Sequence, residues 1–182
     1  MPRHVAVMLL AVARALRPVA RSVRTQVRPR STVAEAESRF ITGHPDCNVT
    51  PYLANLVGRA LHKKSAHPLG IIKDRIEAYF EGLETSYDVF DGEDPVVTTT
   101  RCFDDLNIPP EHPGRSKSDT YYLTDTELLR THTSAHQSAL MREGKEAFLC
   151  TGDVYRRDEI DASHFPAFHQ ARTRALDARR TG

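Results

Sequence analysis

The sequence has 182 residues, room for one ordinary domain, and its 40% hydrophobic and 27% charged residues are typical of a globular protein. No apolar run is long enough to cross a bilayer, which disfavours a membrane-embedded protein. The three cysteines, Cys47, Cys102 and Cys150, lie far apart and form no CxxC pair. They argue against a disulfide scaffold and a cysteine zinc site, and fit a reducing compartment.

The net charge of +1 conceals a strongly basic N-terminal segment. No acidic residue precedes Glu35, and arginines that recur at alternating spacings of three and four share one helical face: Arg14, Arg17, Arg21, Arg24 and Arg28. An arginine-rich, acid-free, amphipathic leader is typical of a mitochondrial transit peptide. We therefore predict that residues 1–34 are such a peptide, that cleavage falls within residues 30–40, and that the protein is located in the mitochondrial matrix.

A secretory signal is the alternative interpretation of the same leader. Arg3 would be its basic start and residues 5–13 its apolar core, and Asn48-Val49-Thr50 supplies a glycosylation sequon. The arginines continue past any plausible cleavage site, however, and the cysteines are not paired. Both features favour mitochondrial import.

Two helices are expected in the first half of the remaining chain. Residues 48–64 carry leucine and valine at helical spacing, and His67-Pro68 then stops the chain and begins a second helix, because proline suits the first helical turn. In the second helix several apolar side chains fall on one face, which we expect to pack on a sheet: Ile72, Ile76, Tyr79, Phe80 and Leu83.

Short strands and one long loop follow. Residues 86–90 and 96–100 are the next strand candidates, because turn-forming residues separate them and the second run is β-branched. Residues 103–115 have three prolines and one glycine among their last seven positions and indicate a loop. Residues 121–123 then predict a strand. Its two tyrosines could line an amino-acid pocket or simply pack in the core.

Residues 128–134 alternate apolar and polar side chains, as a half-buried strand does. Ser134 and Gln137 form a capping-box pattern that predicts a helix through Arg142, although Thr124 and Glu127 offer an earlier start. His132 and His136 are spaced like the zinc ligands of a metalloprotease, but a threonine stands between them where the catalytic glutamate would be. We therefore predict no metal ligands among the site residues.

The last motif is a predicted hairpin. The apolar run 147–150 leads to Tyr155-Arg156-Arg157-Asp158, and the acidic turn 158–163 connects this strand to a second candidate, residues 164–170. Arginine suits phosphate because its planar group donates two parallel hydrogen bonds and keeps its charge. An arginine pair alone is more often a solvated surface feature than a phosphate-binding site.

These motifs together resemble one family. The sequences RTHTSAHQ (130–137) and GDVYRRDEIDASHFPAFHQ (152–170), with HPL (67–69) opening an isoleucine-rich helix, are similar to phenylalanyl-tRNA synthetases, above all to their single-chain mitochondrial type. The resemblance covers residues 48–170. It implies an α+β class II aminoacyl-tRNA synthetase catalytic domain, an antiparallel sheet flanked by helices, with its N-terminal part in residues 35–170. It also implies a monomer that uses ATP and Mg²⁺ to activate phenylalanine and transfers it to tRNA(Phe).

The resemblance also implies roles for single residues. It makes Arg156 the catalytic residue, which holds the α-phosphate while the phenylalanine carboxylate attacks, so that charge developing on the phosphate oxygens is stabilised. Three further residues would bind ATP, namely Asp158, where the family usually has glutamate, His164, and Phe168 as the ring on which adenine stacks. Four would bind phenylalanine: His132, Ser134, Gln137 and Gln170.

The pattern departs from the family after Gln170. The family continues there with Leu-Glu-Gly, whose glutamate helps to bind the substrate ammonium group, whereas this chain has Ala171-Arg172-Thr173. Residues 171–182 are therefore expected to be a divergent arginine-rich tail, and the catalytic domain to be incomplete, without motif 3 and the anticodon-binding domain. Two hypotheses follow: a ligase by family whose chain as given is inactive, or an inert fragment with at most residual tRNA or protein binding.

Overall fold

The computed structural model describes residues 33–159 and 161–175. The predicted transit peptide lies outside the described residues except for its last two positions, and so does the tail after residue 175. The described residues belong to one compact unit. No helix among them combines the length and the apolar character needed to span a bilayer.

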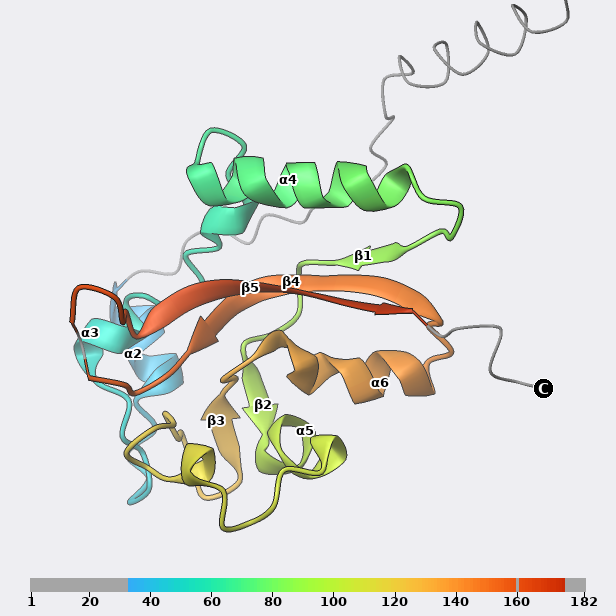
Figure 1. The fold of residues 1–182 in the computed structure, drawn as a ribbon. Helices are drawn as coiled ribbons and strands as arrows, with labels where there is room; N and C mark the ends of the chain where they lie inside the picture. The colour runs from blue at the N-terminus through green and yellow to red at the C-terminus, as the bar shows by residue number, and fades with distance from the viewer. Residues whose placement is uncertain (1–32, 160, 176–182) are drawn as a thin grey trace, which may run out of the picture. The chain divides into compact units, whose positions relative to one another are not determined.

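Helices and short strands alternate in the first two thirds of the unit, and two long strands end it (Figure 1). The α-helices are α2 (Val33–Phe40), α3 (Pro51–Ala54), α4 (Pro68–Glu81), α5 (Thr99–Cys102) and α6 (Gln137–Arg142). The 3₁₀ turns are η1 (Leu61–Lys63), η2 (Asp104–Leu106), η3 (Pro113–Arg115) and η4 (Thr133–His136). The strands are β1 (Asp88–Phe90), β2 (Val96–Thr98), β3 (Glu127–Leu129), β4 (Ala147–Tyr155) and β5 (Ala167–Ala175).

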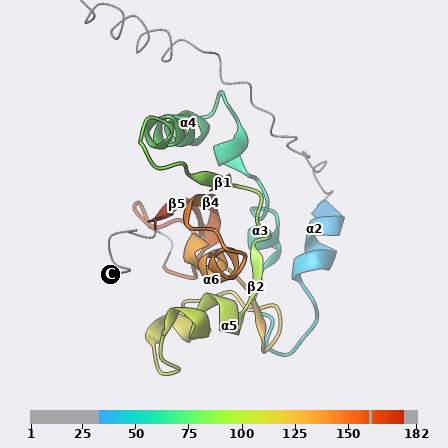
Figure 2. The ribbon, with the colours of Figure 1, turned by 90° about the vertical axis from the view of Figure 1, so that its right-hand side faces the viewer.

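The strands form two sheets. The larger has the order β1-β4-β5, in which β4 and β5 are antiparallel and β1 runs parallel to β4. β2 and β3 pair antiparallel in the second sheet. Figures 1 and 2 show α4 on one face of the larger sheet and α6 on the other. The predicted α+β fold, with antiparallel strands flanked by helices, is confirmed.

The β4–β5 hairpin is the element that sequence predicted best. Tyr155 pairs with Ala167 and Gly152 with Gln170, so the acidic turn does connect two antiparallel strands. The second strand was predicted at residues 164–170, but it begins three residues later, because His164 lies in an exposed turn around Asp161. β5 also continues past Gln170 to Ala175, pairing Arg172 with Cys150.

Helix α4 begins where predicted, with Pro68 in its first turn and a ring nitrogen of His67 accepting the Leu69 N–H at 3.2 Å. The predicted packing face is wrong, since Ile72 is 54% and Tyr79 67% exposed.

The buried face of α4 instead carries Gly70, Lys73 and Glu77. Lys73 Nζ lies 2.6 Å from Glu77 Oε1 and 3.0 Å from Asp91 Oδ2. Burial acts to lower the pKa of Lys73, but these two carboxylates outweigh it and hold that pKa above its ordinary value. Gly70 fits because it passes the Lys64 carbonyl so closely that an added Cβ would lie 2.0 Å from the oxygen. The helix is therefore held by ion pairs and close backbone contact, which apolar periodicity does not reveal.

Three other predicted elements are shorter than expected or absent. The helix predicted over residues 48–64 is limited to α3 and η1, because Gly58 and Ala60 adopt positive φ between them. Residues 121–123 form no strand beyond a single bridge from Tyr122 to Leu128, and both tyrosines pack in the core.

The predicted strand 128–134 keeps pairing only to Leu129. The prediction of a capping box at Ser134 is also wrong, because the 3₁₀ turn η4 precedes α6 and neither element begins with a side-chain cap. The alternative capping residues do interact, because Thr124 Oγ1 accepts the Glu127 N–H at 2.9 Å, but they close a turn before β3 rather than begin a helix.

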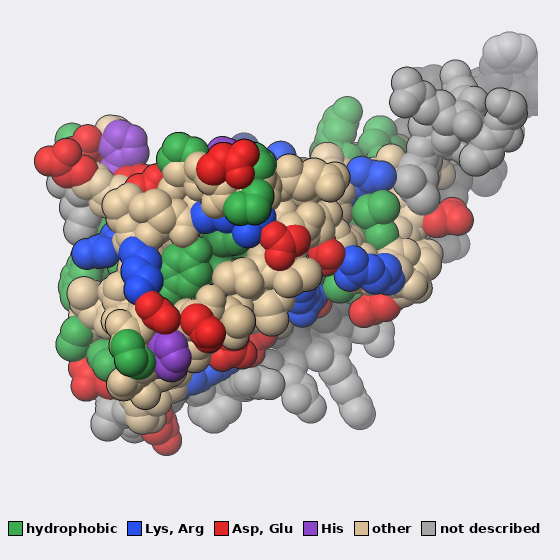
Figure 3. Space-filling model, turned by 90° about the horizontal axis from the view of Figure 1, so that it is seen from below, with side chains coloured by type: hydrophobic (Ala, Val, Ile, Leu, Met, Phe, Trp, Pro, Cys, Tyr) green, Lys and Arg blue, Asp and Glu red, His purple; other side chains and the backbone are tan. Residues whose placement is uncertain are grey.

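The buried side chains form three clusters that hold these elements together. The largest joins α2 and α3 to Leu129 and Tyr155, and a second gathers Cys102 and Leu128 around α5 and β3. The third joins α6 to β4 through Leu140 and Phe148. Figure 3 shows the face on which α5 lies, where acidic and basic side chains stand next to one another with hydrophobic groups between them. The second cluster includes Ala135 of η4, and the third holds the following helix, α6, against β4 of the hairpin that carries several of the predicted site residues.

Candidate active site

Arg156 stands directly after β4, at the entrance to the hairpin turn. Its backbone N–H bonds to the Pro166 carbonyl at 3.0 Å, which fixes the chain there. Its Nε donates to the Thr131 carbonyl oxygen at 3.2 Å, and its guanidinium carbon lies 5.2 Å from the centre of the Phe168 ring. Arg156 and Phe168 are therefore brought together, as a shared phosphate and adenine site requires.

Gln170 joins the same surface from β5. Its side-chain Oε1 accepts the Thr133 N–H at 3.3 Å, so the amide lies against the first residue of η4. Because side chains alternate along a strand, Phe168 and Gln170 point to the same face of β5. Four of the predicted residues thus meet where η4 crosses the hairpin: His132, Arg156, Phe168 and Gln170.

His132 is half-buried beside this surface and lies 3.9 Å from Cys102 Sγ through its Nε2. Burial, together with the positive charges of Arg156 and Arg172, lowers the pKa of His132 to about 4. Its Nδ1 is buried and has no hydrogen-bond partner among the described residues. A neutral imidazole with an unused polar atom can take a hydrogen bond from a ligand.

Ser134 and Gln137 lie further along the same segment, in η4 and at the start of α6, and both are half-buried. The segment that carries His132 therefore also carries these two residues, which the sequence assigned to phenylalanine binding. His136, in contrast, turns away from the site, with Nε2 lying 2.8 Å from Arg130 Nη1.

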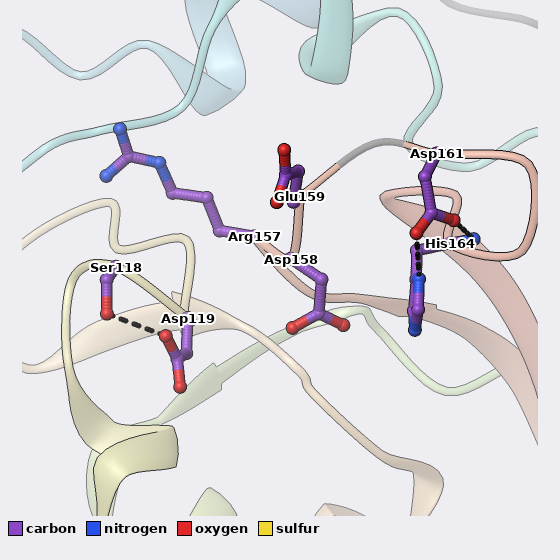
Figure 4. A pocket seen from close by; sticks show the side chains of 7 residues that line it. All are labelled: Ser118, Asp119, Arg157, Asp158, Glu159, Asp161 and His164. Atoms are coloured by element: carbon purple, nitrogen blue, oxygen red, sulfur yellow. Dashed lines mark hydrogen bonds and ion pairs between the residues drawn. The ribbon is translucent and has the colours of Figure 1, made fainter.

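Asp158 and His164 lie apart from Arg156, in the exposed hairpin turn. They line an open cavity of about 450 Å³, with Asp119, Arg157 and Asp161 among the other lining residues (Figure 4). Figure 4 shows Asp158 between Asp119 and His164, and Arg157 pointing away from it. His164 Nδ1 lies 2.9 Å from Asp161 Oδ2, and this carboxylate raises the pKa of His164. The structure does not bring these two predicted ATP ligands into contact with Arg156.

Sequence reasoning missed Arg130, the buried cation that supports the site. The Arg130 side chain donates Nε to the Asp153 carbonyl at 2.7 Å and Nη1 to the Glu93 carbonyl at 3.2 Å. Its guanidinium lies so close to β4 that a Cβ added at Gly152 would be 2.0 Å from Nη2. A charged residue directly after the apolar pair Leu128-Leu129 is the available signal, because such a residue needs buried partners.

Comparison with known proteins shows the family. The family model described as the class II core domain of tRNA synthetases (F) matches residues 51–181. The chain belongs to this family. The match to the class II core includes β5 and residues beyond Gln170, where the expected divergent tail begins.

Within the class II family, this chain is similar to mitochondrial phenylalanine–tRNA ligases. The mitochondrial phenylalanine–tRNA ligase of Saccharomyces cerevisiae is 46% identical over 139 residues, which are 72% of this chain and 30% of that protein. Those of Dictyostelium discoideum and Mus musculus are 50% and 47% identical, over 68% of this chain and 28% and 29% of their own lengths. The predicted resemblance is confirmed. The matched part of this chain spans about 30% of the length of these relatives.

Proposed function

We propose that this chain carries the phenylalanine- and ATP-binding residues of a mitochondrial phenylalanine–tRNA ligase. The observation that supports it most is the meeting of Arg156, Phe168 and Gln170 at η4, since they come from separate parts of the β4–β5 hairpin. Arg156 binds the α-phosphate, Phe168 stacks on adenine, and Gln170 orients the substrate amino group. His132, Ser134 and Gln137 line the phenylalanine side.

The chemistry is attack of the phenylalanine carboxylate on the α-phosphorus, which brings two anions together. A cation held in place stabilises the charge that develops on the phosphate oxygens. Arg156 suits this role because its Nε is tied to Thr131, which leaves the terminal guanidinium nitrogens available for a phosphate. Neutral His132 adds no further charge beside the substrate ammonium group.

ATP would bring Mg²⁺, which commonly binds through one or two carboxylates in addition to substrate phosphates. Asp158 and Asp161 line the cavity at the hairpin turn and offer the hard oxygen ligands that Mg²⁺ prefers. When bound, the ion would neutralise the charge of the pyrophosphate leaving group. His164, whose charged form Asp161 favours, would lie on the same phosphate side.

A second candidate function is favoured by Arg172. In β5 it follows Gln170 by two positions, where the family pattern has a glutamate for the substrate ammonium group, and its charge acts on His132. Like charges repel, so Arg172 should weaken phenylalanine binding. The chain would then be an inert member of the family, with at most residual tRNA or protein binding.

Binding of a non-hydrolysable phenylalanyl-adenylate analogue distinguishes the two functions. We expect calorimetry to show saturable binding to the 182-residue chain, and Arg156→Ala to weaken it by about 10- to 100-fold, as loss of a charge-assisted hydrogen bond does. Arg157→Ala is the matched control, because Arg157 donates to the Lys117 carbonyl outside the site. No binding by the wild-type chain would favour the inert candidate.

The proposal extends to location and partners. We infer a family role in the mitochondrial matrix, as a monomer with phenylalanine and tRNA(Phe) as substrates. The names of the similar ligases support the mitochondrion and the two substrates, and the arginine-rich leader supports the mitochondrion. Phenylalanine-dependent ATP–pyrophosphate exchange tests activity itself. We expect none from this chain as given, because of Arg172.

A further inference from the structure

We propose that His62, Asp153 and His169 form a buried binding site for a divalent transition-metal ion, most suitably Zn²⁺. The three residues come from η1, β4 and β5, and one ligand atom from each lies within 4.8 Å of the others. This site is separate from Arg156 and does not depend on the proposed adenylate chemistry.

The three ligand atoms converge on one point, with the carboxylate oxygen between the two imidazoles. His62 Nδ1 lies 3.1 Å and His169 Nε2 3.0 Å from Asp153 Oδ1. At such distances hydrogen bonds are expected, yet all three atoms are buried without an aligned partner among the described residues. Ligand atoms about 2.0–2.2 Å from a tetrahedral zinc lie about 3.3–3.6 Å apart, so the two nitrogens need to move only a few tenths of an ångström away from the carboxylate oxygen to admit the ion.

Burial favours a metal over a solvated ion pair. The side chains of His62 and Asp153 are 4% and 8% exposed, and that of His169 is 12% exposed. A buried carboxylate must be paired, or must bind a metal, to offset the loss of hydration. Two imidazoles and one carboxylate are the donors that catalytic zinc sites combine, and imidazole selects transition metals over Mg²⁺.

The surrounding hydrogen bonds orient the ligand atoms. His62 Nε2 lies 3.3 Å from the Asp91 carbonyl, so this nitrogen can carry the proton and leave Nδ1 free for a metal. Asp153 Oδ2 accepts the Ala60 N–H at 3.2 Å and lies 3.4 Å from the Tyr155 hydroxyl. These contacts hold one carboxylate oxygen and leave Oδ1 directed at both histidines.

A metal here would join three distant parts of the chain. Asp153 and His169 are paired across the β4–β5 hairpin, and His62 belongs to the segment between α3 and α4. His169 points to the face of β5 opposite to its neighbours Phe168 and Gln170. The ion would therefore fasten η1 to the hairpin from behind the candidate active site, with a water as its fourth ligand.

Titration of the metal-free, full 182-residue chain with Zn²⁺ and with Co²⁺ tests this proposal. We expect one tight equivalent, a tetrahedral Co²⁺ absorption spectrum, and a melting temperature that zinc raises. Asp153→Asn should lower the affinity for this zinc ion by more than about 100-fold, because loss of a group that only supports a metal ligand already costs up to about 100-fold. Asp46→Asn is the matched control, because Asp46 and His44 form a partly exposed pair of the same kind.

Two further measurements keep the test decisive if Asp153→Asn does not fold. His62→Gln changes a ligand in the short η1 turn and should also abolish the tight equivalent. X-ray absorption on the wild-type zinc complex should show nitrogen and oxygen ligands only. Absence of a tight equivalent, sulfur at about 2.3 Å from zinc, or unchanged affinity in folded His62→Gln would overturn the proposal and leave a metal-free histidine–carboxylate cluster.

Discussion

Gly152→Ala should destabilise the protein strongly, because Gly152 lies directly against the guanidinium of Arg130. The added Cβ would be 2.0 Å from Nη2 and 2.9 Å from Cζ, whereas non-bonded heavy atoms prefer about 3.5–4.0 Å. Arg130 cannot retreat freely, since it is 3% exposed and is held by bonds of 2.7 Å to Asp153 and 2.8 Å to His136. Breaking both bonds costs about 1.5–3 kcal/mol each, so we expect a loss of roughly 3–6 kcal/mol.

Urea denaturation followed by far-UV circular dichroism measures this loss. Gly82→Ala is the control, because its Cβ would meet the Tyr79 and Ala78 carbonyl oxygens at ordinary distances of 3.4 and 3.8 Å. The free energy of unfolding of this variant should change by less than about 1 kcal/mol. Combining Gly152→Ala with Arg130→Ala should cost little more than Arg130→Ala alone, since the clash is then removed. A Gly152→Ala variant within about 1 kcal/mol of wild type would refute the close approach of Arg130.

Three further predictions concern charge and location. The unfolded chain protonates His132 near pH 6.5 and the folded protein only near pH 4, so stability should fall by roughly 3 kcal/mol as the pH drops between these values. The urea concentration at the unfolding midpoint should decrease as the pH is lowered, and it should decrease less steeply with pH in His132→Asn. An equally steep decrease in this variant would contradict the assignment of the pH dependence to His132. Arg172→Glu should raise the pKa of His132, measured by NMR titration, because Arg172 is one of the cations that lower it; an unchanged pKa would place Arg172 out of reach. Residues 1–40 fused to a fluorescent protein should enter mitochondria, and secretion of the fusion would contradict the transit-peptide prediction.

Local signals explain which parts of the fold could be predicted. Pro68 fixes the start of α4, and the apolar run before Tyr155 predicts β4, because each depends on adjacent residues. The buried face of α4 could not be predicted in the same way. Buried Lys73 is paired with Glu77 of the same helix and also with Asp91, which lies outside the helix beyond β1.

Local signals likewise predict only some of the contacts in the candidate site. Antiparallel pairing of Tyr155 with Ala167 brings Arg156 near Phe168, so a predicted hairpin already implies their contact. The approach of η4 to Gln170 depends on packing between distant segments, and only the family resemblance pointed to it. His62 gave no signal, because its partners Asp153 and His169 lie about 90 residues or more away.

A crystal structure of the chain with a phenylalanyl-adenylate analogue tests the central claim most directly, namely that Arg156, Phe168 and Gln170 form one adenylate site. We predict that the phosphate group or its substitute lies within hydrogen-bond distance of Arg156, at about 2.7–3.2 Å. Adenine should stack on Phe168 and the amino group should lie beside Gln170. An analogue bound elsewhere, with Arg156 and Phe168 both outside its contacts, would contradict the account.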